Sequence, residues 1–96
     1  MITKTYFKTK DYCKVKFSFA PEQAETVEVL GLNQDWDNGV ILKKKKDGTF
    51  AGEVSLPKGS QHQFKYLINE TDWVNDESAD GVTFNEFGGL NCVINL

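Results

Sequence analysis

Residues 12–19 read YCKVKFSF, and this stretch decides the fold class. Its odd-numbered positions carry cysteine, valine and phenylalanine, whereas lysine and serine stand between them. Successive side chains of a β-strand point to opposite faces, so this spacing predicts a strand with one buried face and one solvated face. Pro21 ends the strand, because proline cannot donate a hydrogen bond to a neighbouring strand.

The same period of two continues along the chain, interrupted by short turns such as Asp47-Gly48, a strong hairpin signal. Further strands are predicted over residues 26–30, 40–42, 50–56, 61–68, 73–74 and 90–96, with a long polar loop over 75–89. No stretch has helical periodicity. About seven short strands predict an all-β antiparallel sandwich. We expect one complete, free-standing domain over residues 1–96, with residues 1–10 as a flexible segment.

The composition limits the classes of partner. The formal net charge is −3 and the chain contains no arginine, which disfavours nucleic acid and anionic membranes as partners. No apolar run approaches the roughly 20 residues that span a bilayer. The first residues lack the apolar centre of a secretory signal. We therefore expect a cytoplasmic protein with no nucleic-acid or membrane partner.

The sequence contains no recognisable catalytic or metal-binding pattern. His62 is the single histidine and shares the apolar face of its strand with Phe64 and Tyr66, so we expect a buried histidine rather than a catalytic one. One histidine and the distant Cys13 and Cys92 do not make a tetrahedral metal site. The cysteines are expected to be reduced core thiols, with a disulfide as the alternative. No catalytic residue, metal or cofactor is predicted.

Charged residues gather in two places. Asp72, Asp76, Glu77 and Asp80 have no spacing that fits a calcium loop, so a solvated acidic loop is expected there. Lysines occupy positions 43–46 beside the hairpin turn, where they are expected to form a solvated face that protects a sheet edge. Glycoside hydrolysis needs two carboxylates flanking a bond in a cleft, and a domain of this size offers little cleft.

Two tryptophans are unusually placed. Trp36 stands between Asp35 and Asp37 in a polar loop, and Trp73 follows Asp72 just after a turn. Exposed loop tryptophans are typical of recognition surfaces, although a large indole can also pack inward. A flat indole offers a face to the CH-rich side of a sugar ring, and nearby amides and charged groups can bond the ring hydroxyls. The composition therefore suggests sugar binding without being specific for it.

The motifs follow the order found in the family 48 carbohydrate-binding modules, also called isoamylase N-terminal or early-set domains. Residues 27–36 resemble the family's V-x-V-x-G-x-F-N-x-W segment. Further matching pieces occur, in order, at residues 47–50, 56–59, 63–69, 73–76 and 85–94. The match runs from about Tyr12 to the last strand. The chain is most similar to small stand-alone bacterial early-set proteins, and the family includes the glycogen-binding domain of the AMP-activated kinase β subunit.

The resemblance implies an immunoglobulin-like early-set sandwich that binds glycogen, starch-like chains or maltooligosaccharides without cleaving them. By this resemblance Trp36 and Trp73 cradle the sugar, and Lys65 and Asn91 make polar contacts with it. Phe87 stands where the family has a leucine that packs against the sugar ring, and it fits a core position equally well. Strand alternation independently directs the lysine away from the apolar face of its strand.

The chain departs from the family pattern around its first tryptophan. Asn33 replaces the family's loop phenylalanine, and the segment between Trp36 and Asp47 is a residue shorter. Two alternatives stay open. The first is a degenerate early-set domain that associates with a glucan-processing enzyme of the glycoside hydrolase family 13 type, through an apolar patch or an edge strand. The second is a free-standing hydrolase, suggested only by the family's frequent fusion to catalytic barrels.

Overall fold

The computed structural model describes residues 1–96 and is built almost entirely from strands. The elements in chain order are β1 (Ile2–Tyr6), β2 (Tyr12–Phe19), β3 (Val27–Leu30), the single-turn helix η1 (Leu32–Gln34), β4 (Val40–Lys44), β5 (Phe50–Pro57), β6 (Gln61–Ile68), β7 (Asp72–Val74), β8 (Gly81–Phe84) and β9 (Leu90–Asn95). None of these elements is a helix with the length and apolar character needed to cross a membrane.

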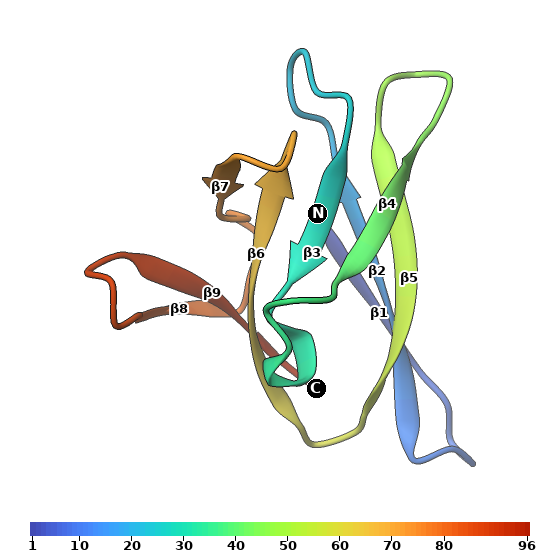
Figure 1. Cartoon of the computed structure of the whole chain (residues 1–96). Helices are drawn as coiled ribbons and strands as arrows, with labels where there is room; N and C mark the ends of the chain where they lie inside the picture. The colour runs from blue at the N-terminus through green and yellow to red at the C-terminus, as the bar shows by residue number, and fades with distance from the viewer.

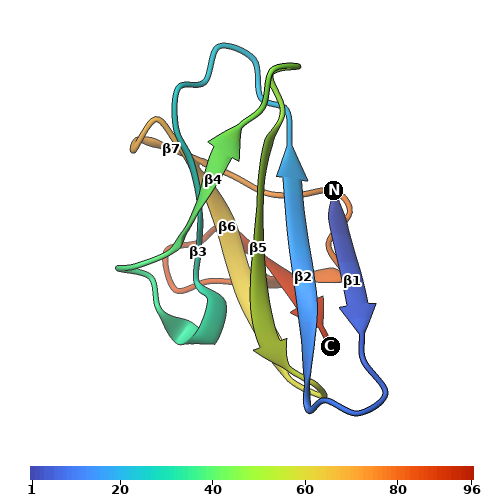
Figure 2. The same cartoon turned by 90° about the vertical axis from the view of Figure 1, so that its right-hand side faces the viewer.

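The strands form two layers joined through β4. Their order is β1-β2-β5-β4-β3-β6-β9-β8, with β7 added to β6, and every pair is antiparallel. The first residues of β4 pair with β3, whereas Lys43 and Lys44 pair with β5. The strip of strands therefore folds over at β4, and β1, β2 and β5 lie across from β3 and β6 (Figures 1 and 2). This confirms the predicted all-β antiparallel sandwich.

The core lies between the layers and follows the alternation in the sequence. Val15 and Phe17 of β2 meet Phe64 and Tyr66 of β6, and all four side chains are fully buried. The rings of Phe17 and Phe64 pack edge to face with centroids 5.3 Å apart, an arrangement that aromatic pairs favour. Both cysteines are buried and unpaired, so the two core thiols are present and the disulfide is not.

The structure contains two strands, β1 and β8, that the sequence pattern does not predict. Residues 1–10 were expected to be a flexible segment, but Ile2–Tyr6 forms β1 along β2. The polar loop expected over 75–89 contains β8, which pairs with β9 as a projecting hairpin (Figure 1). Both are edge strands, which need only one neighbour and no strongly apolar face, so their alternation is faint. The lysines of 43–46 do not protect an edge, because β4 lies between β3 and β5.

Candidate functional site

The loop after β3 presents Trp36 above a glycine. The chain enters η1 through Gly31, whose φ of 106° lies in the left-handed region that favours glycine. A Cβ at Gly31 would lie 2.7 Å from the Trp36 ring and 2.6 Å from the backbone oxygen of Gln63. Asp35 Oδ1 accepts hydrogen bonds from two backbone N–H groups of the following turn, at 3.1 and 3.0 Å, and these bonds hold the pKa of Asp35 below its usual value. The indole therefore rests directly on the backbone of a closed loop.

Replacing Gly31 with alanine is expected to displace Trp36. The new Cβ would overlap the indole, and alanine at this φ is strained, so the free energy of unfolding should fall by about 2 kcal/mol or more. Gly48→Ala is the matched control, because Gly48 also has a positive φ, of 89°, but open space around its Cβ. Urea unfolding and the tryptophan fluorescence spectrum measure both effects. Equal losses of stability in the two variants, with unchanged fluorescence, would contradict the close packing of Gly31 under Trp36.

His62 fastens this loop to β6. Its Nδ1 accepts a hydrogen bond from the backbone N–H of Asn33 at 3.1 Å, so the ring proton is on Nε2, which donates to Ser60 Oγ at 2.8 Å. The side chain is 9% exposed, and burial lowers its pKa below the usual 6.5. The expected buried histidine is confirmed, and it supports the loop that carries Trp36.

The free energy of unfolding is expected to fall as the pH is lowered below about 6.5. The unfolded chain takes up a proton at His62 near pH 6.5, whereas the folded protein does so only at lower pH. This contribution to stability is therefore complete above pH 6.5 and is lost as the pH falls through the folded pKa, with a slope of at most about 1.4 kcal/mol per pH unit. Urea unfolding of wild type and His62→Gln measures it. Because the chain has no other histidine, the variant should lose this slope, and an unchanged slope would count against the assignment.

Trp73 lies beside Trp36 on the outer surface of the sandwich. It belongs to β7 and stands opposite Leu67 of β6. The two indoles meet edge to face, with ring centroids 6.3 Å apart and planes at 61°. Trp36 is 39% exposed and Trp73 is 48% exposed, so neither packs into the core. We call these two residues the tryptophan pair.

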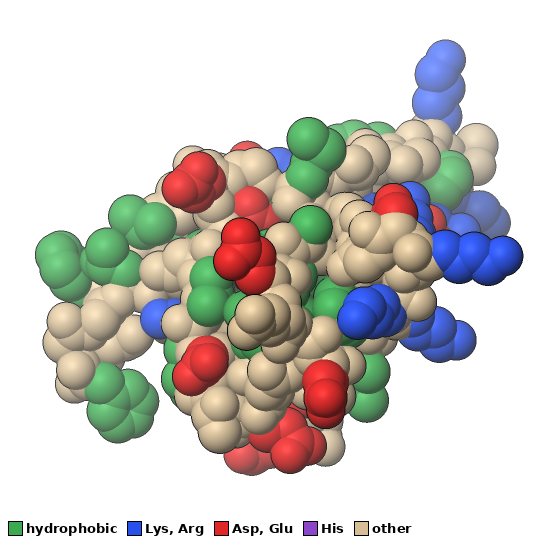
Figure 3. Space-filling view, turned by 90° about the horizontal axis from the view of Figure 1, so that it is seen from above, with side chains coloured by type: hydrophobic (Ala, Val, Ile, Leu, Met, Phe, Trp, Pro, Cys, Tyr) green, Lys and Arg blue, Asp and Glu red, His purple; other side chains and the backbone are tan.

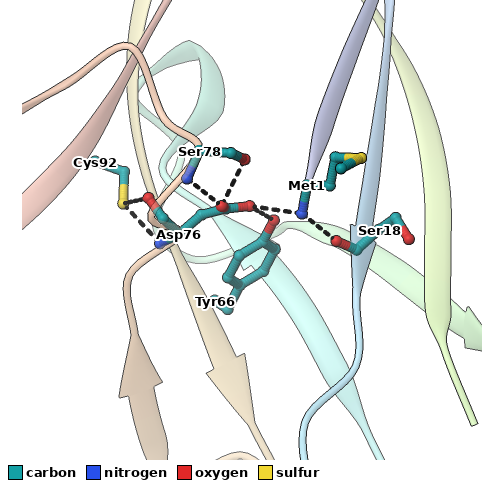
Figure 4. A network of polar contacts seen from close by, with 6 residues as sticks. All are labelled: Met1, Ser18, Tyr66, Asp76, Ser78 and Cys92. Carbon is teal, nitrogen blue, oxygen red and sulfur yellow. Dashed lines mark hydrogen bonds and ion pairs between the residues drawn. The ribbon is translucent and has the colours of Figure 1, made fainter.

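A buried carboxylate anchors the chain just after Trp73 (Figure 4). Asp76 Oδ2 accepts hydrogen bonds from the Tyr66 hydroxyl at 2.6 Å and from the Met1 ammonium at 3.2 Å, and Oδ1 accepts from the N–H and hydroxyl of Ser78 at 2.8 and 2.7 Å. Burial alone would raise the pKa of Asp76, but the donated hydrogen bonds outweigh it and hold that pKa below its usual value. The expected solvated loop is therefore wrong at Asp76, which ties this segment to the core.

The β8–β9 hairpin forms the other side of the site, and Asn85 organises its turn. Asn85 Oδ1 accepts hydrogen bonds from the backbone N–H groups of Phe87 and Gly89, both at 3.0 Å. The backbone N–H of Asn85 donates to the backbone oxygen of Gly89 at 2.9 Å, and this hydrogen bond closes the turn. Phe87 projects from this turn and is 88% exposed, so the reading of Phe87 as a core residue is wrong.

Side-chain hydrogen bonds hold the hairpin against β6. Lys65 Nζ donates to the Leu90 oxygen at 2.9 Å. Asn91 Nδ2 donates to Gln63 Oε1 at 3.0 Å, and Asn91 Oδ1 accepts from Asn85 Nδ2 at 3.1 Å. Asn91 is only 6% exposed, whereas Gln63 is exposed. The two sides of the site are therefore fixed relative to each other by polar contacts.

A hollow of about 830 Å³ lies between the tryptophan pair and the hairpin. Figure 3 shows hydrophobic side chains standing out on the left, where Figure 1 places the hairpin, and a recess between them and the body of the molecule. This volume is within the range of about 300–1,000 Å³ typical of ligand sites. The lining consists of Trp36, Gln63, Lys65, Trp73, Phe84, Asn85, Glu86, Phe87, Gly89 and Asn91. The five residues singled out in the sequence all line this one hollow.

Sequence reasoning missed two amides of the lining. Gln63 is two positions before Lys65 and shares its face of β6, so the alternation that placed the lysine also places Gln63. Asn85 could not be found in this way, because its position depends on a hairpin that the sequence did not predict.

The lining suits a neutral, polar ring. Lys65 and Glu86 are its only charged members, and the single carboxylate cannot supply the pair that glycoside hydrolysis needs. Aromatic faces offer stacking surfaces, and three amides and an ammonium group offer hydrogen bonds. The site is therefore chemically equipped to bind a sugar chain by stacking and hydrogen bonding.

A family comparison covers this region in full. Residues 13–96 match the family described as the glycogen recognition site of AMP-activated protein kinase. No curated protein matches the chain. The matched range is most of the 96 residues and includes every residue of the hollow. The chain therefore belongs to the family of the glycogen recognition site of AMP-activated protein kinase.

Proposed function

We propose that this protein is a non-catalytic binding module for α-glucan chains, namely glycogen, starch-like chains or maltooligosaccharides. The observation that carries the proposal is the tryptophan pair. Both indoles are partly exposed and line the hollow together with Lys65, and the chain belongs to a glycogen-recognition family. Exposed apolar patches rimmed by polar residues mark interaction or ligand-binding sites.

The sugar is bound by stacking and by hydrogen bonds. Trp36 and Trp73 offer their faces to the CH-rich sides of consecutive glucose rings, and Phe87 covers the chain from the hairpin. Lys65 uses one of its three N–H donors on the Leu90 oxygen, so two donors are left for sugar hydroxyls. Asn91 keeps one N–H and one oxygen lone pair for the same purpose.

The expected affinity is low. A stacked ring contributes ~1 kcal/mol beyond the area it buries. A few such contacts give a dissociation constant of roughly micromolar to millimolar. Glycogen presents many chain ends, so one particle can hold many copies of the protein, but a domain with a single site is expected to bind each chain end about as tightly as an oligosaccharide.

Co-sedimentation tests the proposed function. The pure protein should pellet with glycogen and with amylose, and should stay in solution with cellulose, whose β-linked chain has a different shape. Free maltoheptaose should release it from glycogen. Equal recovery with cellulose and glycogen would contradict an α-glucan module. Release of reducing sugar from glycogen would contradict the non-catalytic role.

A second candidate function is association with a glucan-processing enzyme in the cytoplasm. It is favoured by the exposed apolar side chains of the hairpin outside the tryptophan pair: Val82 is 60% exposed and Phe84 is 82% exposed on edge strand β8. An edge strand with exposed apolar residues can add to another sheet. Under this alternative the domain would not respond to maltooligosaccharides at all.

A further inference from the structure

We propose that Gln63 is a further glucan-contacting residue, and that a relay of three side-chain amides, Asn85–Asn91–Gln63, aims its Nε2 into the hollow. This inference rests on the proposed function and deepens it, because it names a hydrogen-bond donor to the sugar.

The relay starts at Asn85, whose orientation is set by the backbone. Its Oδ1 accepts from the N–H groups of Phe87 and Gly89, both at 3.0 Å. A backbone N–H can only donate, so the atom facing it must be the amide oxygen. The Nδ2 of Asn85 is therefore on the other side, where it meets Asn91 at 3.1 Å.

The orientation then passes from one amide to the next. Because Asn85 donates, the Asn91 atom that faces it must be Oδ1, and Asn91 must present Nδ2 on its far side. That Nδ2 lies 3.0 Å from Gln63, so the Gln63 atom is Oε1. The Nε2 of Gln63 is left pointing away from Asn91, and no hydrogen bond within the protein uses it.

The position of Gln63 suits a sugar contact. Its side chain is exposed, lines the hollow and shares a face of β6 with Lys65. Its backbone oxygen lies against Gly31, directly under Trp36. The two free N–H donors of Nε2 are therefore on the side of the Gln63 amide away from Asn91, in a side chain that lines the hollow, where sugar hydroxyl oxygens would accept them. Asn91, which is 6% exposed, uses one of its N–H groups to hold Gln63 in this orientation.

Replacing Gln63 with glutamate tests the role of the Nε2 donor. Glutamate keeps an acceptor for Asn91 Nδ2 but has no N–H to give. We expect maltoheptaose binding, measured by calorimetry, to weaken about three- to tenfold, the range for losing one hydrogen bond. Gln61→Glu is the matched control: Gln61 shares the same strand face, but its Nε2 is bound to Asn95 Oδ1 at 2.7 Å and it does not line the hollow. Wild-type affinity is expected for that variant.

A second measurement distinguishes direct contact between Gln63 and the sugar from indirect structural support of the site by Gln63. In ¹⁵N-labelled wild type, the side-chain NH₂ signals of Gln63 should move on addition of maltoheptaose, whereas those of Gln61 should not. If Gln63→Glu binds as tightly as wild type, or if the Gln63 signals stay fixed while the tryptophan signals move, the role of Gln63 is overturned and the proposed function stands. If wild type shows no binding at all, both fall together.

Discussion

Replacing Trp73 with alanine is expected to weaken binding to maltoheptaose by roughly thirtyfold and to abolish retention on glycogen. The variant loses a stacking face and the apolar area buried by a sugar ring, together about 2 kcal/mol. Trp73 is 48% exposed and lies in a short strand held mainly by backbone pairing, so its truncation should leave the fold intact. Calorimetric titration and glycogen co-sedimentation measure the loss.

Tyr6→Ala is the matched control for the tryptophan variant. Tyr6 is an aromatic residue with 53% exposure on β1, outside the hollow. Its removal should leave glucan binding unchanged. Normal glycogen retention by a folded Trp73→Ala protein would show that Trp73 is not part of the binding surface.

Replacing Tyr66 with phenylalanine is expected to lower the free energy of unfolding by about 1.5–3 kcal/mol, the range for a hydrogen bond to a charged group. The variant removes the fully buried hydroxyl that donates to Asp76 at 2.6 Å. For a domain of this size the melting temperature should fall by about 4–8 °C per kcal/mol. Urea and thermal unfolding provide the measurement.

Tyr6→Phe removes a hydroxyl from an exposed tyrosine and controls for the substitution itself, with an expected change within about 0.5 kcal/mol. If the Tyr66 variant is as stable as wild type, Asp76 does not depend on that hydroxyl. Asp76 follows Trp73 by three positions, so the same variant should also loosen Trp73 and weaken maltoheptaose binding modestly.

Much of the fold could be read from strand alternation. The predicted limits of β2 and β6 agree with the structure, since both strands have one fully apolar face and clear turn residues at their ends. The same alternation placed Lys65 on the outer face, where the hollow lies. Buried strands are predictable because the core requires an apolar residue at every second position.

The features that the sequence did not predict depend on pairing between distant segments. β1 and β8 are edge strands. β1 is mostly polar and β8 has only four residues, so each is defined by pairing with its neighbour rather than by its own sequence pattern. Asp76 has the sequence context of an ordinary loop carboxylate, because nothing near it in sequence indicates its buried hydrogen bond with the Tyr66 hydroxyl. The amide relay likewise requires the register of β6, β8 and β9, which alternation alone does not fix.

The most direct test of the central claim is a titration of the ¹⁵N-labelled protein with maltoheptaose, following the indole N–H signals of Trp36 and Trp73. An α-glucan module requires both signals to shift and saturate with maltoheptaose, and to stay fixed with cellohexaose at the same concentrations. If neither indole signal moves with maltoheptaose, the hollow is not a glucan site, and association with a partner protein through the hairpin becomes the better explanation.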